Sequence, residues 1–190
     1  IRDARISPYE LTTRRGEGKF ALLTCAPSGD VMLRWVLRST EALSRIQKHA
    51  PGLKASWPAL RVHSINLLPE HKAVLEGQTE ILLAGDDALC MQINEIPLYL
   101  RPQSFFQTHT TVAAQLYAQA RDWVARIGPS HLWDLFCGVG GFALHCAPHA
   151  QRVTGIEISS EAIASAQRSC AALGIDNVQS TATRHRRCFV

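Results

Sequence analysis

The chain lacks the features that define several protein classes. None of its apolar runs reaches the roughly 18–20 residues that cross a bilayer, and its first residues form no signal segment. Its six cysteines include no CxxC pair and no zinc-finger spacing with histidine. These absences exclude a membrane-spanning protein and favour a cytoplasmic protein with free thiols. The first residue is Ile1 rather than Met, which indicates an internal or processed piece of a longer protein.

Charge of one sign is not in large excess either. The 190 residues are 46% hydrophobic and 19% charged, with a net charge of +4, which is typical of a globular protein. No broad basic face of the kind that alone announces nucleic-acid binding is evident. Function must therefore be sought in local motifs.

Short apolar segments separated by turn residues fill residues 1–95. Pro27-Ser28-Gly29-Asp30 is strong turn chemistry and predicts a hairpin over about residues 19–37. Thr40 is expected to cap a short helix that stops before Pro51-Gly52. Further short strands are expected over residues 60–67, 79–84, 88–93 and 97–101. We expect a small α+β domain over residues 1–95, in which no motif carries chemistry.

The pattern changes in residues 96–190, where helices and strands alternate. A helix ended by Gly128-Pro129 presents one apolar face, formed by Val112, Leu116, Ala120, Trp123, Val124 and Ile127. A strand over 131–136, a glycine loop with a helix to about 146, a strand over 152–158, a helix over 160–173 and a strand from 178 follow. This order predicts an α/β fold, the first half of a doubly wound parallel sheet.

The segment Asp134-Leu-Phe136-Cys-Gly138-Val-Gly140-Gly141 joins the first of these parallel strands to its helix. Glycines allow a sharp turn and the close approach of a ligand to the backbone. Glu157 follows Gly138 by 19 residues, the spacing at which a carboxylate meets ribose hydroxyls in dinucleotide and S-adenosylmethionine enzymes. Asp134 favours S-adenosylmethionine, because a carboxylate attracts an ammonium and a sulfonium but repels a pyrophosphate.

A second motif, Arg101-Pro-Gln-Ser-Phe105-Phe106-Gln107-Thr-His109, precedes the long helix. Two aromatics followed by an amide can pack against a cofactor or stack on a base; alternatively, both aromatics belong to the core. His145 and His149 lie four residues apart without a third ligand nearby, so we expect a surface pair and no metal site.

Taken together, the two motifs and Gly155-Ile-Glu157 resemble the RNA uracil-5 methyltransferases, and most closely the bacterial enzymes that act on 23S ribosomal RNA. The resemblance runs over nearly the whole chain. It implies a Rossmann-like S-adenosylmethionine-dependent fold preceded by a central domain, residues 1–95, that helps to hold RNA. It also implies cofactor contacts at Gln107, Asp134, Phe136, Gly138, Gly140 and Glu157, and RNA contacts at Phe105 and Phe106.

The chain departs from this family in several places. His109 stands where the family usually has Asn, and no counterpart of the family's iron–sulfur cysteines is present, so no cluster is expected. The family's nucleophilic Cys and its Glu base belong beyond the end of this chain, so no catalytic residue is expected within it. Cys137 then becomes a packing residue. Residues 182–190 look unlike the family.

Three functions stay open. We favour methyl transfer to C5 of a uridine in 23S ribosomal RNA by a monomeric enzyme, of which this chain is an inactive piece. A nicotinamide-dinucleotide oxidoreductase would use Gly138-x-Gly140-x-x-Ala143, the loose dinucleotide pattern. The third function is a non-catalytic RNA-binding remnant, which the absent Cys and Glu suggest.

Overall fold

A computed structural model describes residues 2–182, which form two compact units that divide between Leu89 and Cys90. Residues 182–190, which look unlike the family, lie outside the described residues apart from Ala182. Within the described residues, no helix combines the length and the hydropathy needed to cross a bilayer.

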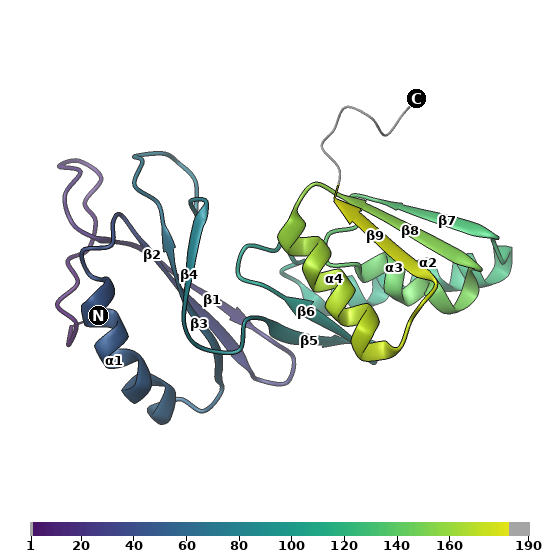
Figure 1. The fold of residues 1–190 in the computed structure, drawn as a ribbon, viewed down its shortest axis with the longest axis horizontal. Helices are drawn as coiled ribbons and strands as arrows, with labels where there is room; N and C mark the ends of the chain where they lie inside the picture. The colour runs from purple at the N-terminus through teal and green to yellow at the C-terminus, as the bar shows by residue number, and fades with distance from the viewer. Residues whose placement is uncertain (1, 183–190) are drawn as a thin grey trace. The chain divides into compact units, whose positions relative to one another are not determined.

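The first unit is a four-stranded sheet with one long helix (Figure 1). β1 (Gly18–Cys25) and β2 (Val31–Leu37) form the expected antiparallel hairpin. β3 (Leu60–Leu67) runs parallel to β2, and β4 (Thr79–Gly85) runs antiparallel to β3. The parallel pair needs a crossover, which α1 (Leu43–Ser56) supplies.

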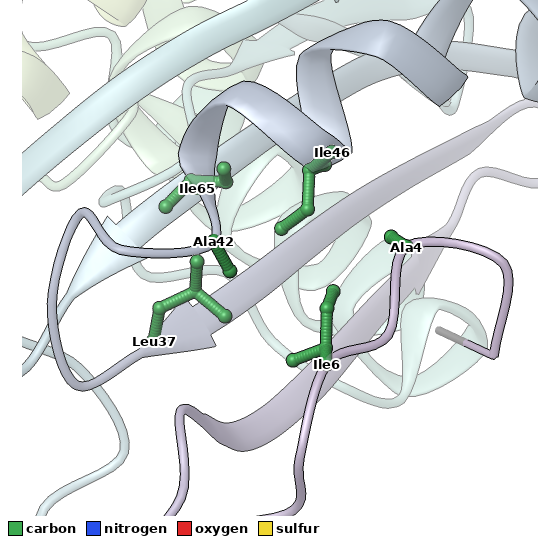
Figure 2. Close-up of a cluster of buried hydrophobic side chains, with 6 residues drawn as sticks. All are labelled: Ala4, Ile6, Leu37, Ala42, Ile46 and Ile65. Atoms are coloured by element: carbon green, nitrogen blue, oxygen red, sulfur yellow. The ribbon is translucent and has the colours of Figure 1, made fainter.

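A small apolar core joins α1, the N-terminal segment and the sheet (Figure 2). Its buried members are Ala4, Ile6, Leu37, Ala42, Ile46 and Ile65. Trp35 packs against this core from β2. The N-terminal segment is therefore part of the first unit's structure and not a loose extension.

The expectation for α1 was wrong at both ends. The helix does not stop before Pro51-Gly52 but continues to Ser56, and its N-cap is Ala42 rather than Thr40, with no side-chain capping bond. A proline removes one helical hydrogen bond, but the buried side chains of Ile46 and Ala50 hold the helix on the sheet. Tertiary packing here overrides the local stop signal.

The second unit contains the expected alternation of strands and helices (Figure 1). β7 (His131–Leu135), β8 (Arg152–Glu157) and β9 (Val178–Ala182) form a parallel sheet in that order, which confirms the α/β prediction. The remaining elements are β5 (Leu89–Ile93), β6 (Ile96–Leu100), α2 (Thr110–Ile127), α3 (Gly141–Cys146), the 3₁₀ turn η1 (Ala147–His149) and α4 (Ser160–Leu173).

The predicted apolar face of α2 exists, but the described residues do not bury it. Leu116 is 50% exposed, Trp123 58% and Ile127 73%, whereas the adjacent Ala113 and Tyr117 are buried. Trp133 and Leu135 of β7 are also exposed. An apolar surface on α2 and β7 thus stays uncovered by residues 2–182.

Candidate functional site

The candidate site lies at the carboxyl ends of β7 and β8. Asp134 stands opposite Gly155 in the parallel register, so the loop after β7 and Glu157 at the end of β8 reach the same edge of the sheet. Ligands of open parallel sheets bind at this edge, because the loops and helix N-termini there present unpaired backbone groups. The fold therefore brings Asp134, the glycine loop and Glu157 together.

The loop between β7 and α3 has a left-handed backbone at three positions. The φ angles are +63° at Phe136, +53° at Gly138 and +85° at Gly140. A Cβ on Gly140 would lie 3.2 Å from the Ala166 Cβ, whereas a Cβ on Gly138 would meet no atom within 4 Å. Gly140 is thus required for packing against α4, and Gly138 borders open space that a ligand can use.

Phe136 is unusual because a bulky residue rarely adopts a positive φ. Its side chain is 68% exposed, so the core does not require this conformation. Backbone strain of this kind costs on the order of 1–3 kcal/mol and tends to occur at functional sites. The loop therefore holds an aromatic ring outward, next to the open space at Gly138.

Glu157 binds the loop directly. Its Oε2 accepts a hydrogen bond from the Gly138 N–H at 3.0 Å. Its Oε1 accepts two more, from the Ile158 N–H at 2.7 Å and the Ser159 N–H at 2.9 Å. A carboxylate offers about four acceptor positions, so Glu157 can accept one further hydrogen bond from a ligand.

Asp134 is largely buried beneath the same loop. Burial raises the pKa of its carboxyl from 3.8 to about 6; the hydrogen bond that it accepts from the Ala143 N–H at 2.9 Å opposes this shift, and the negative charge of Glu157 adds to it. At pH 7 the carboxylate is still mostly ionised. Two carboxylates thus flank the glycine loop, an arrangement that attracts a cation.

Cys137 points away from this space. Its Sγ would lie 2.8 Å from a Cβ on Gly155, so the thiol fills the gap that this glycine leaves in β8. The residue is 7% exposed, and burial, with the negative charges of Asp134 and Glu157, raises the pKa of the thiol to about 12. Cys137 is a neutral packing residue at pH 7.

The segment before α2 is attached to α4. Arg101 lies 3.5 Å from Glu161 in an ion pair, and the Ser104 and Ser165 hydroxyls lie 3.4 Å apart. Beyond this attachment Phe105 is 75% exposed, Phe106 is half-buried and Gln107 is exposed. A cofactor contact at Gln107 and RNA contacts at Phe105 and Phe106 therefore stay predictions.

Two histidines have structural roles that the sequence analysis did not predict. His109 caps α2, since its Nδ1 accepts from the Val112 N–H at 3.3 Å. His145 was expected at the surface but is 2% exposed, with its Nδ1 2.6 Å from the Gly141 O and its Nε2 3.3 Å from the Ile93 O. Its ring thus connects the first turn of α3 to Ile93 at the end of β5. The i,i+4 spacing with His149 did not reveal this.

Within residues 2–182, no group of three or more His, Cys, Asp or Glu is arranged to hold a metal ion.

Comparisons with known proteins agree with this geometry. The family model described as tRNA (Uracil-5-)-methyltransferase matches residues 71–184. The chain is 54% identical over 183 residues to the 23S rRNA (uracil(747)-C(5))-methyltransferase RlmC of Vibrio vulnificus, covering 96% of this chain and 49% of the relative. It is 51% identical over 180 residues to the RlmC of Escherichia coli O139:H28, covering 94% and 48%. The chain thus spans about half the length of these relatives.

A solved structure has the same fold at low identity. It is the tRNA (uracil-54, C5)-methyltransferase of Pyrococcus abyssi in complex with S-adenosyl-L-homocysteine, with a TM-score of 0.78 and 18% identity. The match covers 97% of this chain and 44% of that one. The likeness therefore extends over both units described above.

Proposed function

Because this chain belongs to the tRNA (uracil-5-)-methyltransferase family, we propose that it is part of an S-adenosylmethionine-dependent enzyme that methylates C5 of a uridine in 23S ribosomal RNA. The RNA substrate follows the names of the relatives from Vibrio and Escherichia. The choice of S-adenosylmethionine as the cofactor rests on the pair of carboxylates, Asp134 and Glu157, on either side of a glycine loop bordered by open space. The free cysteines among the described residues support a cytoplasmic enzyme, which we propose acts as a monomer.

The residues present suit this cofactor. S-adenosylmethionine supplies an electrophilic methyl group on a sulfonium. Glu157 would accept a hydrogen bond from a ribose hydroxyl, and Asp134 would favour the positive charge of the ligand. Gly138 would admit the ligand to the backbone, and the exposed ring of Phe136 would cover it. Gly140 keeps the loop in place against α4, and Gln107 would complete the pocket from the segment before α2.

The uracil chemistry requires two further groups. C5 of uracil is a poor nucleophile, so a thiolate must first add at C6, and a base must later remove the C5 proton. Near the loop, burial raises the pKa of Cys137 to about 12 and of Cys146 to about 11, and it also raises the pKa of Cys170. None of these thiols supplies a thiolate at pH 7. We therefore assign the nucleophile and the base to the part of the protein that corresponds to the other half of the relatives.

A dinucleotide oxidoreductase is the weaker alternative. The pyrophosphate of a dinucleotide would lie at the glycine loop, next to both carboxylates, and like charges repel. Arg101, on the segment before α2, is already paired with Glu161 at 3.5 Å.

Calorimetric titration with S-adenosylmethionine and, separately, with NADH tests the proposal. The chain should bind the first and not the second. Gly138→Val should abolish binding, because the added side chain would enter the open space at the loop. Gly174→Val is the matched control, since Gly174 has a similar φ of +65° and an equally open Cβ position but lies at the end of α4. Equal loss in both variants, or binding of NADH alone, would contradict the proposed site.

A further inference from the structure

The first unit contains a cavity of about 360 Å³ that the proposed methyl transfer does not use. It lies between α1, the N-terminal segment and the sheet, beside the core shown in Figure 2. Its lining combines apolar residues, the polar side chains of Asp3, His49 and Ser56, and two aromatic rings, Trp35 and His63; the apolar residues and glycine are Ala4, Ile6, Ile46, Ala50, Gly52 and Leu53. A cavity of this size accommodates a small planar group such as a nucleobase.

His63 lines the cavity and has one ring nitrogen without a hydrogen-bonding partner among the described residues. The residue is 1% exposed, and its Nε2 lies 3.0 Å from the Trp35 Nε1. An indole nitrogen only donates, so Nε2 is the acceptor and Nδ1 carries the proton of the neutral ring. Burial lowers the pKa of His63, which keeps the ring neutral. Within residues 2–182, the Nδ1 is buried and has no hydrogen-bonding partner.

An unpaired buried donor is unfavourable, and an acceptor that enters the cavity would remove this cost once the side chains that now cover the Nδ1 move aside. Nucleobases carry such acceptors on their edges, and their faces stack on aromatic rings such as tryptophan. Trp35 and His63 together thus offer a stacking surface and a donor.

Basic side chains lie near the cavity, although Asp3 is part of its lining and Glu41 pairs with Arg45 at 2.6 Å and 2.8 Å. α1 carries Arg45, Lys48 and Lys54 and no acidic residue. The Arg45 Nε donates to the Ala4 O at 2.8 Å, which places the N-terminal segment beside α1. Exposed Arg2 and Arg5 adjoin the lining residues Asp3, Ala4 and Ile6, and exposed Lys48 adjoins His49. Basic side chains around an apolar slot suit a base whose phosphates lie outside.

We propose that this cavity binds one unstacked base of single-stranded RNA, with its neighbouring phosphates on the basic side chains of α1 and the N-terminal segment. The choice of RNA rests on the proposed function. The cavity would give the first unit a contact that depends on a base rather than on the RNA backbone alone.

The test compares a fluorescein-labelled single-stranded RNA of mixed sequence with an abasic oligonucleotide of the same length. By fluorescence anisotropy, the chain should bind the RNA at least about tenfold more tightly than the abasic probe. His63→Phe should reduce this preference about threefold to tenfold, because the ring is kept and the donor is lost. Gly52→Phe, at a lining position where a Cβ meets no atom within 4 Å, should reduce it by blocking the cavity. His71→Phe is the matched control, since His71 is exposed and contacts Tyr9 outside the cavity.

Three outcomes would overturn the inference: equal binding of the two probes by the unmodified chain, an unchanged preference in folded Gly52→Phe, or an equal loss in His71→Phe. S-adenosylmethionine titrations of the same variants separate this inference from the proposed function, because the cavity variants should leave cofactor binding unchanged. A chain that binds no cofactor yet prefers the RNA would remove the proposed function and keep the base site.

Discussion

Glu157 shows how one side chain can serve both structure and binding. Its carboxylate accepts hydrogen bonds from Gly138, Ile158 and Ser159, so the loop is already fixed before any ligand arrives. A preorganised site loses less entropy on binding. The same residue is expected to meet the ribose, which makes its replacement informative.

Glu157→Ala should weaken S-adenosylmethionine binding about 10- to 150-fold, because a charge-assisted hydrogen bond is worth roughly 1.5–3 kcal/mol. Glu157→Gln should lose less, since its amide oxygen can still accept from the Gly138 N–H. Calorimetry measures both affinities, and circular dichroism checks the fold. Unchanged affinity in a folded Glu157→Ala variant would remove this residue from the site.

Asp134 is expected to reduce stability at neutral pH. Its folded-state pKa of about 6 lies above the ordinary 3.8, so the folded state binds the proton more tightly than the unfolded chain does. The resulting stability is present at pH 4 and is lost as the pH rises through about 6. Asp134→Asn should therefore be more stable than the unmodified chain at pH 7.5, by about 1–3 kcal/mol, and this advantage should disappear near pH 4.

Urea denaturation of both proteins at several pH values measures this difference. S-adenosylmethionine titrations at pH 7.5 should show weaker binding by Asp134→Asn, because the carboxylate favours a cationic ligand. A stability difference that does not change with pH would show that Asp134 is not the group that titrates.

At the scale of whole elements, close packing at the start of α3 decides how tightly the glycine loop is held. A Cβ on Gly141 would lie 2.5 Å from the Tyr117 ring, and Tyr117 in turn packs edge-on against Phe142 at 4.8 Å. Gly141→Ala should lower the free energy of unfolding by about 1–3 kcal/mol through overpacking. In a Tyr117→Leu background the same change should cost less. Gly52→Ala, in an open helical position of α1, is the control and should be neutral or stabilising.

Sequence patterns predicted the elements well where local chemistry decides the outcome. Gly128 was expected to end α2, and the helix over 160–173 was expected to stop just before Gly174; both glycines adopt the left-handed C-cap conformation. Prediction failed where tertiary contacts decide. α1 continues past Pro51 because its apolar face is held on the sheet, and α2 buries Tyr117 against Phe142 and His145 rather than its longer apolar stripe.

The candidate site was predictable in part for the same reason. Motif spacing indicated Asp134, Gly138 and Glu157 because the end of each parallel strand is set by the strand–loop–helix order. The hydrogen bond from Gly138 to Glu157 and the burial of His145 depend on how separate segments meet, and no local pattern records that. Gln107 stays a prediction, since its expected role rests on the residue types of its motif and on the family resemblance.

At the scale of the molecule, the described residues supply a candidate binding surface without a reactive thiol near it. The chain spans about half the length of its relatives, and the apolar surface on α2 and β7 is uncovered by the described residues. Cys137 lies in the loop but is 7% exposed, and the pKa of its thiol is raised to about 12. We therefore expect this chain alone to bind S-adenosylmethionine and to methylate no RNA.

Transfer of a tritiated methyl group to unmodified 23S ribosomal RNA tests this expectation. The chain alone should give no incorporation above a no-protein control, and extending it with the segment that corresponds to the other half of the relatives should restore turnover. Cys137→Ala in the extended protein should retain most of that activity, because a neutral buried thiol only fills the gap at Gly155. Turnover by the chain alone that disappears in Cys137→Ala would show instead that this thiol becomes accessible and ionised when RNA binds.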